Sequence, residues 1–183
     1  MTVWFVSLLL NEKNAFGFCY QRGIIGVDWD FEDEWDALGF ANIPKEILTP
    51  ESLLKKLATA PLAMKKGDFV WTRNWEKDGG DDRFYLGKIP PYRKNESPWE
   101  RCGHGSQHEE REEYASAGIL YALSCPLHEV RNSDLGKNDG GTFLSVAKRI
   151  PIFGVQFSDD KTLMQRTERT WQKIEKQIKA KKR

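Results

Sequence analysis

The chain has 183 residues, of which 39% are hydrophobic and 12% aromatic, and its 28 Lys and Arg residues nearly balance 27 Asp and Glu residues. This length and composition predict one domain with a sizeable core and exclude wholesale disorder. The net charge of +1 argues against a protein that coats nucleic acid through bulk charge.

The longest apolar run, residues 4–10, is too short for a transmembrane helix, and the N-terminus lacks the basic start of a secretory signal. Three cysteines make no disulfide framework. We therefore expect a cytoplasmic protein without a membrane partner.

The first third of the chain predicts short strands separated by turns. Residues 3–10 form the first strand and residues 11–14 a turn. Phe16, Phe18 and Tyr20 alternate as in a strand, Gly23 breaks the pattern, and residues 24–27 form a second short strand. Further on, Thr49, Pro50 and Glu51 have the order of a helix start.

The middle of the chain predicts a hairpin and a long loop. A turn at residues 64–68 leads into a strand at 69–71, and residues 83–89 are its expected partner. The polar stretch 92–114 predicts a long functional loop. Later strands are expected at 118–123, with 128–131 continuing beyond Pro126 at a sheet edge, and at 151–157; residues 142–150 fit a helix or a strand.

The last segment predicts a long amphipathic helix with Ser158 as its N-cap. Its apolar stripe is spaced at helical intervals: Leu163, Thr167, Trp171, Ile174 and Ile178. Residues 161–183 hold nine basic and two acidic side chains, a net +7, against −6 for the other 160 residues. This segment either contacts an anionic backbone or is a solubilising face.

The predicted elements indicate an α+β fold, a small barrel-like sheet with helices packed on it. We expect a domain over residues 1–160 and a basic C-terminal helix over 161–183 that packs on it and frays at its end.

Familiar catalytic motifs are absent: the chain has no glycine-rich nucleotide loop, no His-Glu-x-x-His and no Gly-x-Ser-x-Gly. One alternative is a zinc-dependent hydrolase or nuclease that uses Cys102, His104, His108, Cys125 and His128. We favour the plainer interpretation, in which Cys125 is a core thiol and the histidines are loop residues. We accordingly assign no catalytic residue, metal or cofactor.

Tryptophans at polar strand ends are the more informative signal. Trp29, Trp75 and Trp99 lie among polar residues, where an indole ring can stack on a flat ligand such as a nucleic-acid base, although each could instead cover the core. Asp28 and Asn74 lie beside two of them and could bond a base edge.

Taken in order, several stretches resemble the EVE domains of the PUA-like superfamily, which are related to YTH domains. The stretches are VWFV at 3–6, FCYQRGIIGVDW at 18–29, MKKGDFV at 64–70, FYLGKI at 84–89, and residues 118–131. The resemblance implies a small β-barrel with flanking helices that holds a flipped-out, modified base in an aromatic pocket. It implies that Trp29 lies at this pocket, with Trp71 or Trp75 as the other wall. Asp28 stands where the family usually has glycine.

Basic residues surround this expected pocket in the sequence, and we assign them to phosphate binding: Lys65, Lys66, Arg73, Arg83, Lys88 and Arg93. We therefore expect a binding module that reads a modified, for example methylated, base in DNA or RNA, of a kind suited to bacterial or phage defence. The zinc enzyme and a protein-interaction module with exposed tryptophans are the alternatives.

Overall fold

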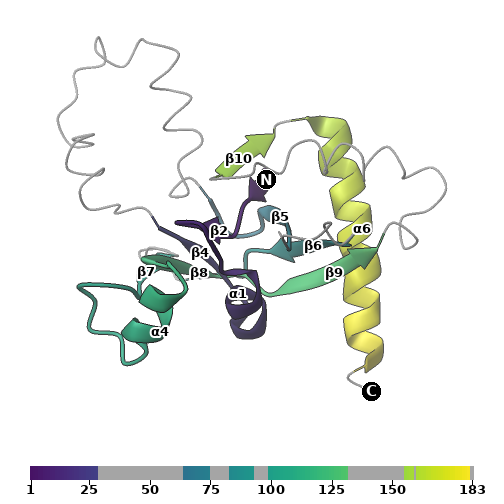
Figure 1. The fold of residues 1–183 in the computed structure, drawn as a ribbon. Coiled ribbons are helices and arrows are strands. Elements are labelled where there is room, and N and C mark those ends of the chain that lie inside the picture. The colour runs from purple at the N-terminus through teal and green to yellow at the C-terminus, as the bar shows by residue number, and fades with distance from the viewer. Residues whose placement is uncertain (29–63, 75–82, 93–98, 132–154, 159, 182–183) are drawn as a thin grey trace, which may run out of the picture.

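The computed structural model describes residues 1–28, 64–74, 83–92, 99–131, 155–158 and 160–181, and this part of the chain is α+β (Figure 1). Its largest sheet has five strands. Their order is β10 (Val155–Ser158), β1 (Val3–Val6), β5 (Phe69–Arg73), β6 (Arg83–Lys88) and β9 (Leu127–Arg131). β1 and β5 are parallel, and the other neighbours are antiparallel.

Two smaller sheets accompany it. One has the order β4 (Ile24–Val27), β8 (Tyr121–Ser124), β7 (Trp99–Arg101), and the other is the hairpin of β2 (Leu9–Leu10) and β3 (Lys13–Asn14). The helices are α1 (Phe16–Arg22), α4 (Arg111–Ser116) and α6 (Lys161–Lys181). Within the described ranges the strands form these separate sheets and no closed barrel.

The central sheet is buried on both faces, which explains the uninterrupted apolar run that begins the chain. Side chains alternate along a strand. Val3 and Phe5 accordingly join the core cluster under α6, while Trp4 and Val6 join the second cluster on the opposite face. A strand covered on both faces has no reason to carry polar positions.

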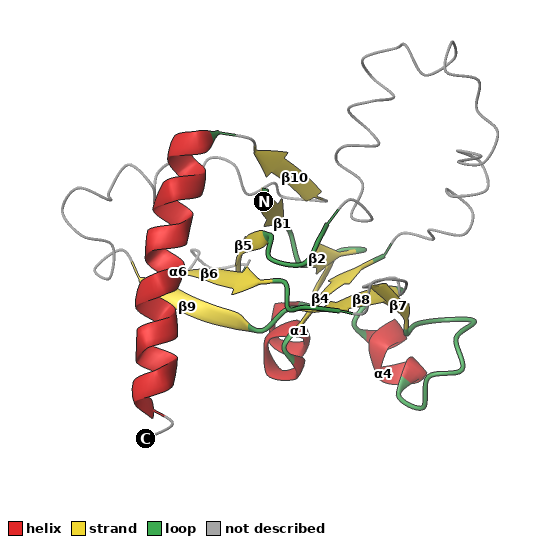
Figure 2. Ribbon diagram, turned by 180° about the vertical axis from the view of Figure 1, so that it is seen from behind, coloured by secondary structure: helices red, strands yellow, loops and turns green. Residues whose placement is uncertain are grey.

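Helix α6 covers one face of this sheet, while α1 and α4 lie on the other side of the molecule (Figure 2). The predicted stripe is confirmed: Leu163, Thr167 and Ile174 are buried, and Trp171 and Ile178 pack against the same cluster.

The predicted N-cap of α6 is wrong by two residues. Asp160 Oδ1 accepts hydrogen bonds from the backbone N–H groups of Thr162 and Leu163, at 2.9 and 3.2 Å. Ser158 is still part of β10, where its Oγ accepts the N–H of Asp160 at 3.2 Å. The carboxylate caps better because it also interacts favourably with the positive end of the helix.

The expected strand around Phe16, Phe18 and Tyr20 is also wrong, because this segment is the helix α1. Phe16 and Cys19, three residues apart, are its buried side chains. Gly23 ends the helix in the left-handed conformation at φ 65°, which glycine adopts without strain. The strand predicted after it is β4.

The predicted hairpin at residues 69–89 is confirmed as β5 and β6, and Asp68 explains the turn before it. This carboxylate is 3% exposed and accepts three hydrogen bonds. The donors are the N–H of Thr2 at 2.8 Å, Trp4 Nε1 at 3.0 Å and the N–H of Lys65 at 3.0 Å. Asp68 therefore joins the turn to the start of β1.

The stretch 92–114 is not one long loop, since it contains β7 and most of α4. The strand predicted around 118–123 is β8. The chain beyond Pro126 forms β9, which lies at the edge of the five-stranded sheet as expected but does not continue β8, because β8 belongs to another sheet. The helix expected after Thr49 and the segment 142–150 lie outside the described residues.

Candidate ligand pocket and nucleic-acid interface

A pocket of about 460 Å³ opens where the β2–β3 hairpin, the end of β4, β7 and the end of α4 meet. Its lining combines polar and charged residues with apolar ones: Asn11, Lys13, Asp28, Arg101, His104, Ala115, Gly118, Ile119 and Leu120. The volume lies within the range of small-molecule sites, about 300–1,000 Å³.

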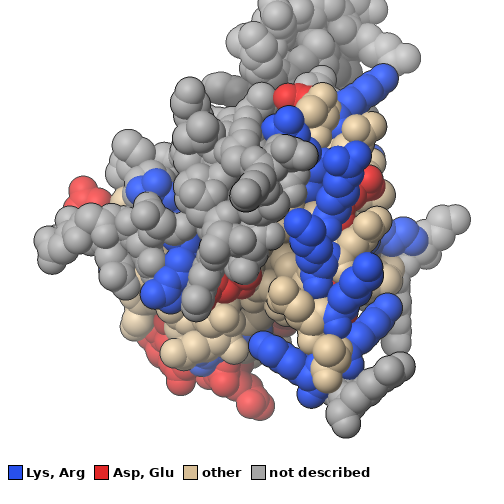
Figure 3. Space-filling view, turned by 90° about the vertical axis from the view of Figure 1, so that its right-hand side faces the viewer, with Lys and Arg blue, Asp and Glu red and all other residues tan. Residues whose placement is uncertain are grey.

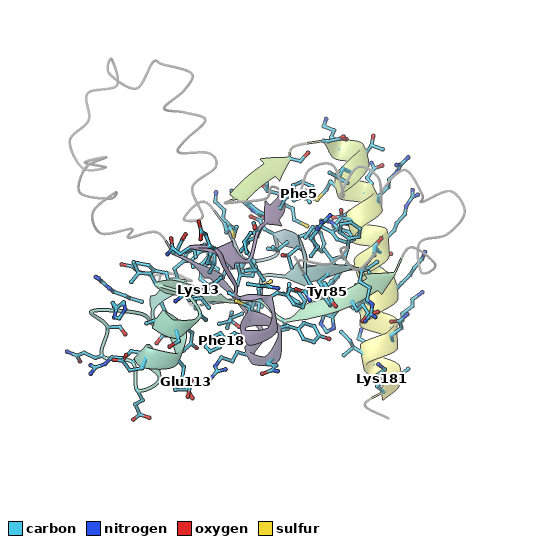
Figure 4. All side chains as sticks on the ribbon, viewed as in Figure 1. Phe5, Lys13, Phe18, Tyr85, Glu113 and Lys181 are labelled. Carbon is cyan, nitrogen blue, oxygen red and sulfur yellow. The ribbon has the colours of Figure 1, made fainter. Side chains whose placement is uncertain are left out.

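The β2–β3 hairpin brings Asn11 and Lys13 to this pocket. Its two turn residues, Asn11 and Glu12, both have positive φ angles, 46° and 64°. Such a two-residue turn matches the twist of the paired strands. Figure 4 places Lys13 on the side of the molecule away from Lys181 at the end of α6.

Strand β7 and the loop after it form another wall. Arg101 Nε donates to the carbonyl of His104 at 3.4 Å. The N–H groups of Cys102 and Gly103 both donate to the carbonyl of Leu120, at 2.9 and 3.0 Å. A Cβ on Gly103 would lie 2.2 Å from the carbonyl oxygen of Ile119, so only glycine permits this approach.

Helix α4 is fixed to α1 by Arg22, which forms ion pairs with Glu110, at 3.6 Å, and with Glu113. The Arg22 guanidinium also lies over the Phe18 ring, 3.9 Å from its centroid. These contacts hold the N-terminal end of α4, and the pocket lies at its other end, beside Ala115.

The pocket combines two cations, Lys13 and Arg101, with the carboxylate of Asp28, which directly follows β4. Cations suit phosphate oxygens, whereas carboxylate and amide groups can accept or donate hydrogen bonds to a base edge. The sequence indicated Asp28 and missed both cations, because Arg101 lies in what looked like a loop and Lys13 beside an ordinary turn.

The other predicted pocket residues have different outcomes. Trp29 and Trp75 lie outside the described residues. Trp71 is 1% exposed, and its Nε1 donates to Thr167 Oγ1 on α6 at 3.1 Å. Its expected place as a pocket wall is wrong, because the ring packs under α6 with no face open to a base. Trp99 is similarly buried, at 6% exposure.

Asn74 lies next to the same hairpin without lining the pocket. Its Oδ1 accepts a hydrogen bond from Nδ2 of Asn14 at 2.8 Å. Asn74 is therefore joined to β3, the strand that also carries Lys13.

The predicted phosphate-binding residues do not form one patch. Lys65 and Lys66 are exposed in the turn before β5, and Lys88 pairs opposite Phe69 at that end of the hairpin. Arg73 and Arg83 lie at the opposite end, where Arg83 contacts Glu129 at 3.6 Å. Arg93 lies outside the described residues. None of the five described residues lines the pocket.

The five proposed zinc ligands are not brought together. Cys125 is fully buried, and burial raises the pKa of its thiol to about 12. His128 lies on β9 against Trp171, with ring centroids 5.6 Å apart, and burial lowers its pKa. His104 lines the pocket, and only Cys102 and His108 remain close, in a group with Glu100.

The exposed side of α6 is lined with Lys and Arg side chains (Figure 3). Its exposed basic residues are Lys161, Arg169, Lys173, Lys176, Lys179 and Lys181. No helix in the described ranges is both long and apolar enough to cross a membrane.

In comparisons with known proteins, no family model, no curated protein and no solved structure matches this chain.

Proposed function

We propose that this chain is a nucleic-acid-binding module of the EVE type, with its base-binding site at the pocket beside Asp28. The observation that carries the proposal is the position of that pocket. It lies at the end of β4, directly before Trp29, the residue that the resemblance to EVE domains places at the modified base.

The lining supports a nucleotide as the ligand. Lys13 and Arg101 supply positive charge for a phosphate, and Asp28 and Asn11 supply hydrogen-bonding groups for a base edge. Ile119 and Leu120 add apolar surface against which a base or its methyl group can pack. The Trp29 ring would add stacking, worth about 1–3 kcal/mol per base.

Phosphate contacts outside the pocket would come from the basic face of α6. Because these contacts are electrostatic, affinity should fall as salt rises for any sequence. The pocket would then decide which base is bound and α6 would raise affinity generally, as in a module for bacterial or phage defence that inspects many sites.

The test is binding of single- and double-stranded DNA and RNA oligonucleotides, with and without a methylated base, at several fixed salt concentrations. Arg101→Ala and Trp29→Ala should each weaken binding of the preferred modified oligonucleotide by about tenfold or more, which corresponds to roughly 1.4 kcal/mol. Trp75→Ala tests the second wall, and Lys161→Ala, at the start of α6, is the matched charge control.

Arg101→Lys separates charge from geometry, because it keeps the cation but loses the planar guanidinium. Equal affinity of the wild type, Arg101→Ala and Trp29→Ala for every oligonucleotide would reject the pocket. A preference lost in the pocket variants and retained in Lys161→Ala supports it.

A further inference from the structure

Three different metal-ligating side chains meet beside β7. The carboxylate of Glu100, the thiol of Cys102 and an imidazole nitrogen of His108 all lie within 4.8 Å of one another. Oxygen, sulfur and nitrogen are the ligand atoms that Zn²⁺ takes in proteins.

The backbone explains why these residues converge. Glu100 and Cys102 are two residues apart at the end of β7, so their side chains leave the same face of the chain, and Arg101 between them leaves the other, toward the pocket. His108 is returned to this face by a tight turn, in which its N–H donates to Ser106 Oγ at 3.3 Å and its carbonyl accepts the N–H of Arg111 at 3.1 Å.

The His108 side chain packs against helix α4. Its ring meets Tyr114 edge to face, with centroids 5.0 Å apart, and Tyr114 is a buried residue of α4. His108 Nδ1 accepts the N–H of Glu110 at 3.2 Å. A metal bound at Nδ1 would replace this hydrogen bond, whereas a metal bound at Nε2 would require the ring proton to move to Nδ1.

The Cys102 side chain is buried and has a weak hydrogen-bond partner. It is 1% exposed, and its thiol donates to the carbonyl of its own near neighbour Glu100 at 3.4 Å. A bound cation would take up the thiolate and offset the negative charge of Glu100, with release of the thiol proton.

We propose that Glu100, Cys102 and His108 bind Zn²⁺, with the fourth position of the tetrahedron taken by water. Ligands of zinc lie about 2.0–2.3 Å from the metal, hence roughly 3.3–3.8 Å from one another. Because the three atoms lie within 4.8 Å of one another, side-chain rotations need to bring them closer by at most about 1.5 Å to complete the site. The ion would tie β7 to the start of α4, directly behind the pocket wall that carries Arg101.

This site differs from the five-residue arrangement considered from the sequence. It omits His104, Cys125 and His128 and recruits Glu100, which no cysteine or histidine spacing reveals. A zinc ion here need not catalyse hydrolysis, and the site is independent of the proposed nucleic-acid binding.

The experiment measures zinc in the full chain after chelation, reloading with Zn²⁺ and dialysis. The wild type should retain about one zinc per chain, and His108→Ala and Glu100→Gln should each retain at least tenfold less at the same free zinc. The matched controls are His104→Ala and Glu109→Gln, which remove an imidazole and a carboxylate from the same loop, and both should retain zinc like the wild type.

Co²⁺ in place of Zn²⁺ reports the thiolate directly through its sulfur-to-cobalt absorption, which Cys102→Ser should abolish. If Cys102→Ser does not fold, as judged by circular dichroism, the zinc content of His108→Ala tests the site instead, because His108 is only half-buried. A wild type that retains no more zinc than His108→Ala, or a cobalt spectrum without the sulfur band, overturns the site.

Discussion

The two faces of the central sheet are built from the same strands but differ in chemistry. The cluster under α6 is mostly apolar, and Trp71 donates a hydrogen bond to Thr167 within it. The opposite cluster holds all three cysteines, and around it lie the pocket and the group of Glu100, Cys102 and His108. Alternation along each strand keeps the two environments apart.

If the proposed function holds, this difference lets one sheet separate general affinity for nucleic acid from recognition of the base. On the α6 side of the sheet, the exposed surface of α6 carries a row of Lys and Arg side chains that can attract any polyanion. The other side has a pocket with defined hydrogen-bonding groups. Phosphate contacts position a nucleic acid, and contacts to the base specify it. Changes on the two faces should therefore have separable effects.

The largest expected effect comes from the α6 core. Ile174 is 6% exposed in the cluster under α6, and Ile174→Ala should lower the free energy of unfolding by about 3 kcal/mol through lost burial and a cavity. Urea unfolding measures the change. Affinity per folded molecule should stay at the wild-type value.

The control is Gln172→Ala, an exposed position two residues earlier on the same helix, which should change stability by less than about 0.5 kcal/mol. If Ile174→Ala reduced ligand affinity as strongly as Arg101→Ala, the faces would not be independent and the comparison would fail.

The sequence predicted the α6 face better than the pocket face. The helical stripe and the β5–β6 hairpin are regular patterns, and each is confirmed. The strand predicted at residues 3–10 is only partly confirmed, because residues 3–6 form β1 while residues 9–10 form β2 in another sheet. Such signals depend on periodicity within one segment, which the sequence displays directly.

The pocket face depends on contacts between short segments far apart in the chain. The elements of this face are short and carry almost no periodic signal: the two-residue strands, the three-residue β7 and the helix α1. In α1, Phe16 and Phe18 also fit the alternation of a strand, which is why the sequence predicts a strand there. Asp28 is predicted from the sequence because it lies beside Trp29. Arg101 and Lys13 are not, because only the folded arrangement brings them together.

A second, smaller effect distinguishes the faces by pH. Burial raises the pKa of the Cys19 and Cys125 thiols from 9.0 to about 12, and both lie in the cluster opposite α6. The unfolded chain loses these protons near pH 9 while the folded chain keeps them, so stability is lost as pH rises above 9. Between pH 8 and 10 the two thiols together should lower the free energy of unfolding by about 2.7 kcal/mol, about 1.4 kcal/mol each.

Urea unfolding at both pH values, with a chelator present, measures this loss. Cys19→Ala should reduce this loss by the contribution of one thiol, about 1.4 kcal/mol, whereas Ile174→Ala should show the full loss from a lower starting stability. An identical pH dependence in the wild type and Cys19→Ala would mean that other groups cause the alkaline loss.

The smallest effect concerns the hairpin that brings Lys13 to the pocket. Glu12 has a φ of 64°, a left-handed conformation that costs a residue with a Cβ about 1 kcal/mol. Glu12→Gly should remove this strain, and because glycine also loses more freedom on folding, the net gain in stability should be about 0.5 kcal/mol. Glu12→Gln is the control, since it removes the charge but keeps the backbone cost, and it should give no gain. Thermal unfolding of the two variants measures the difference. A gain of equal size in both variants would show that the Glu12 charge, and not the left-handed backbone, destabilises this hairpin.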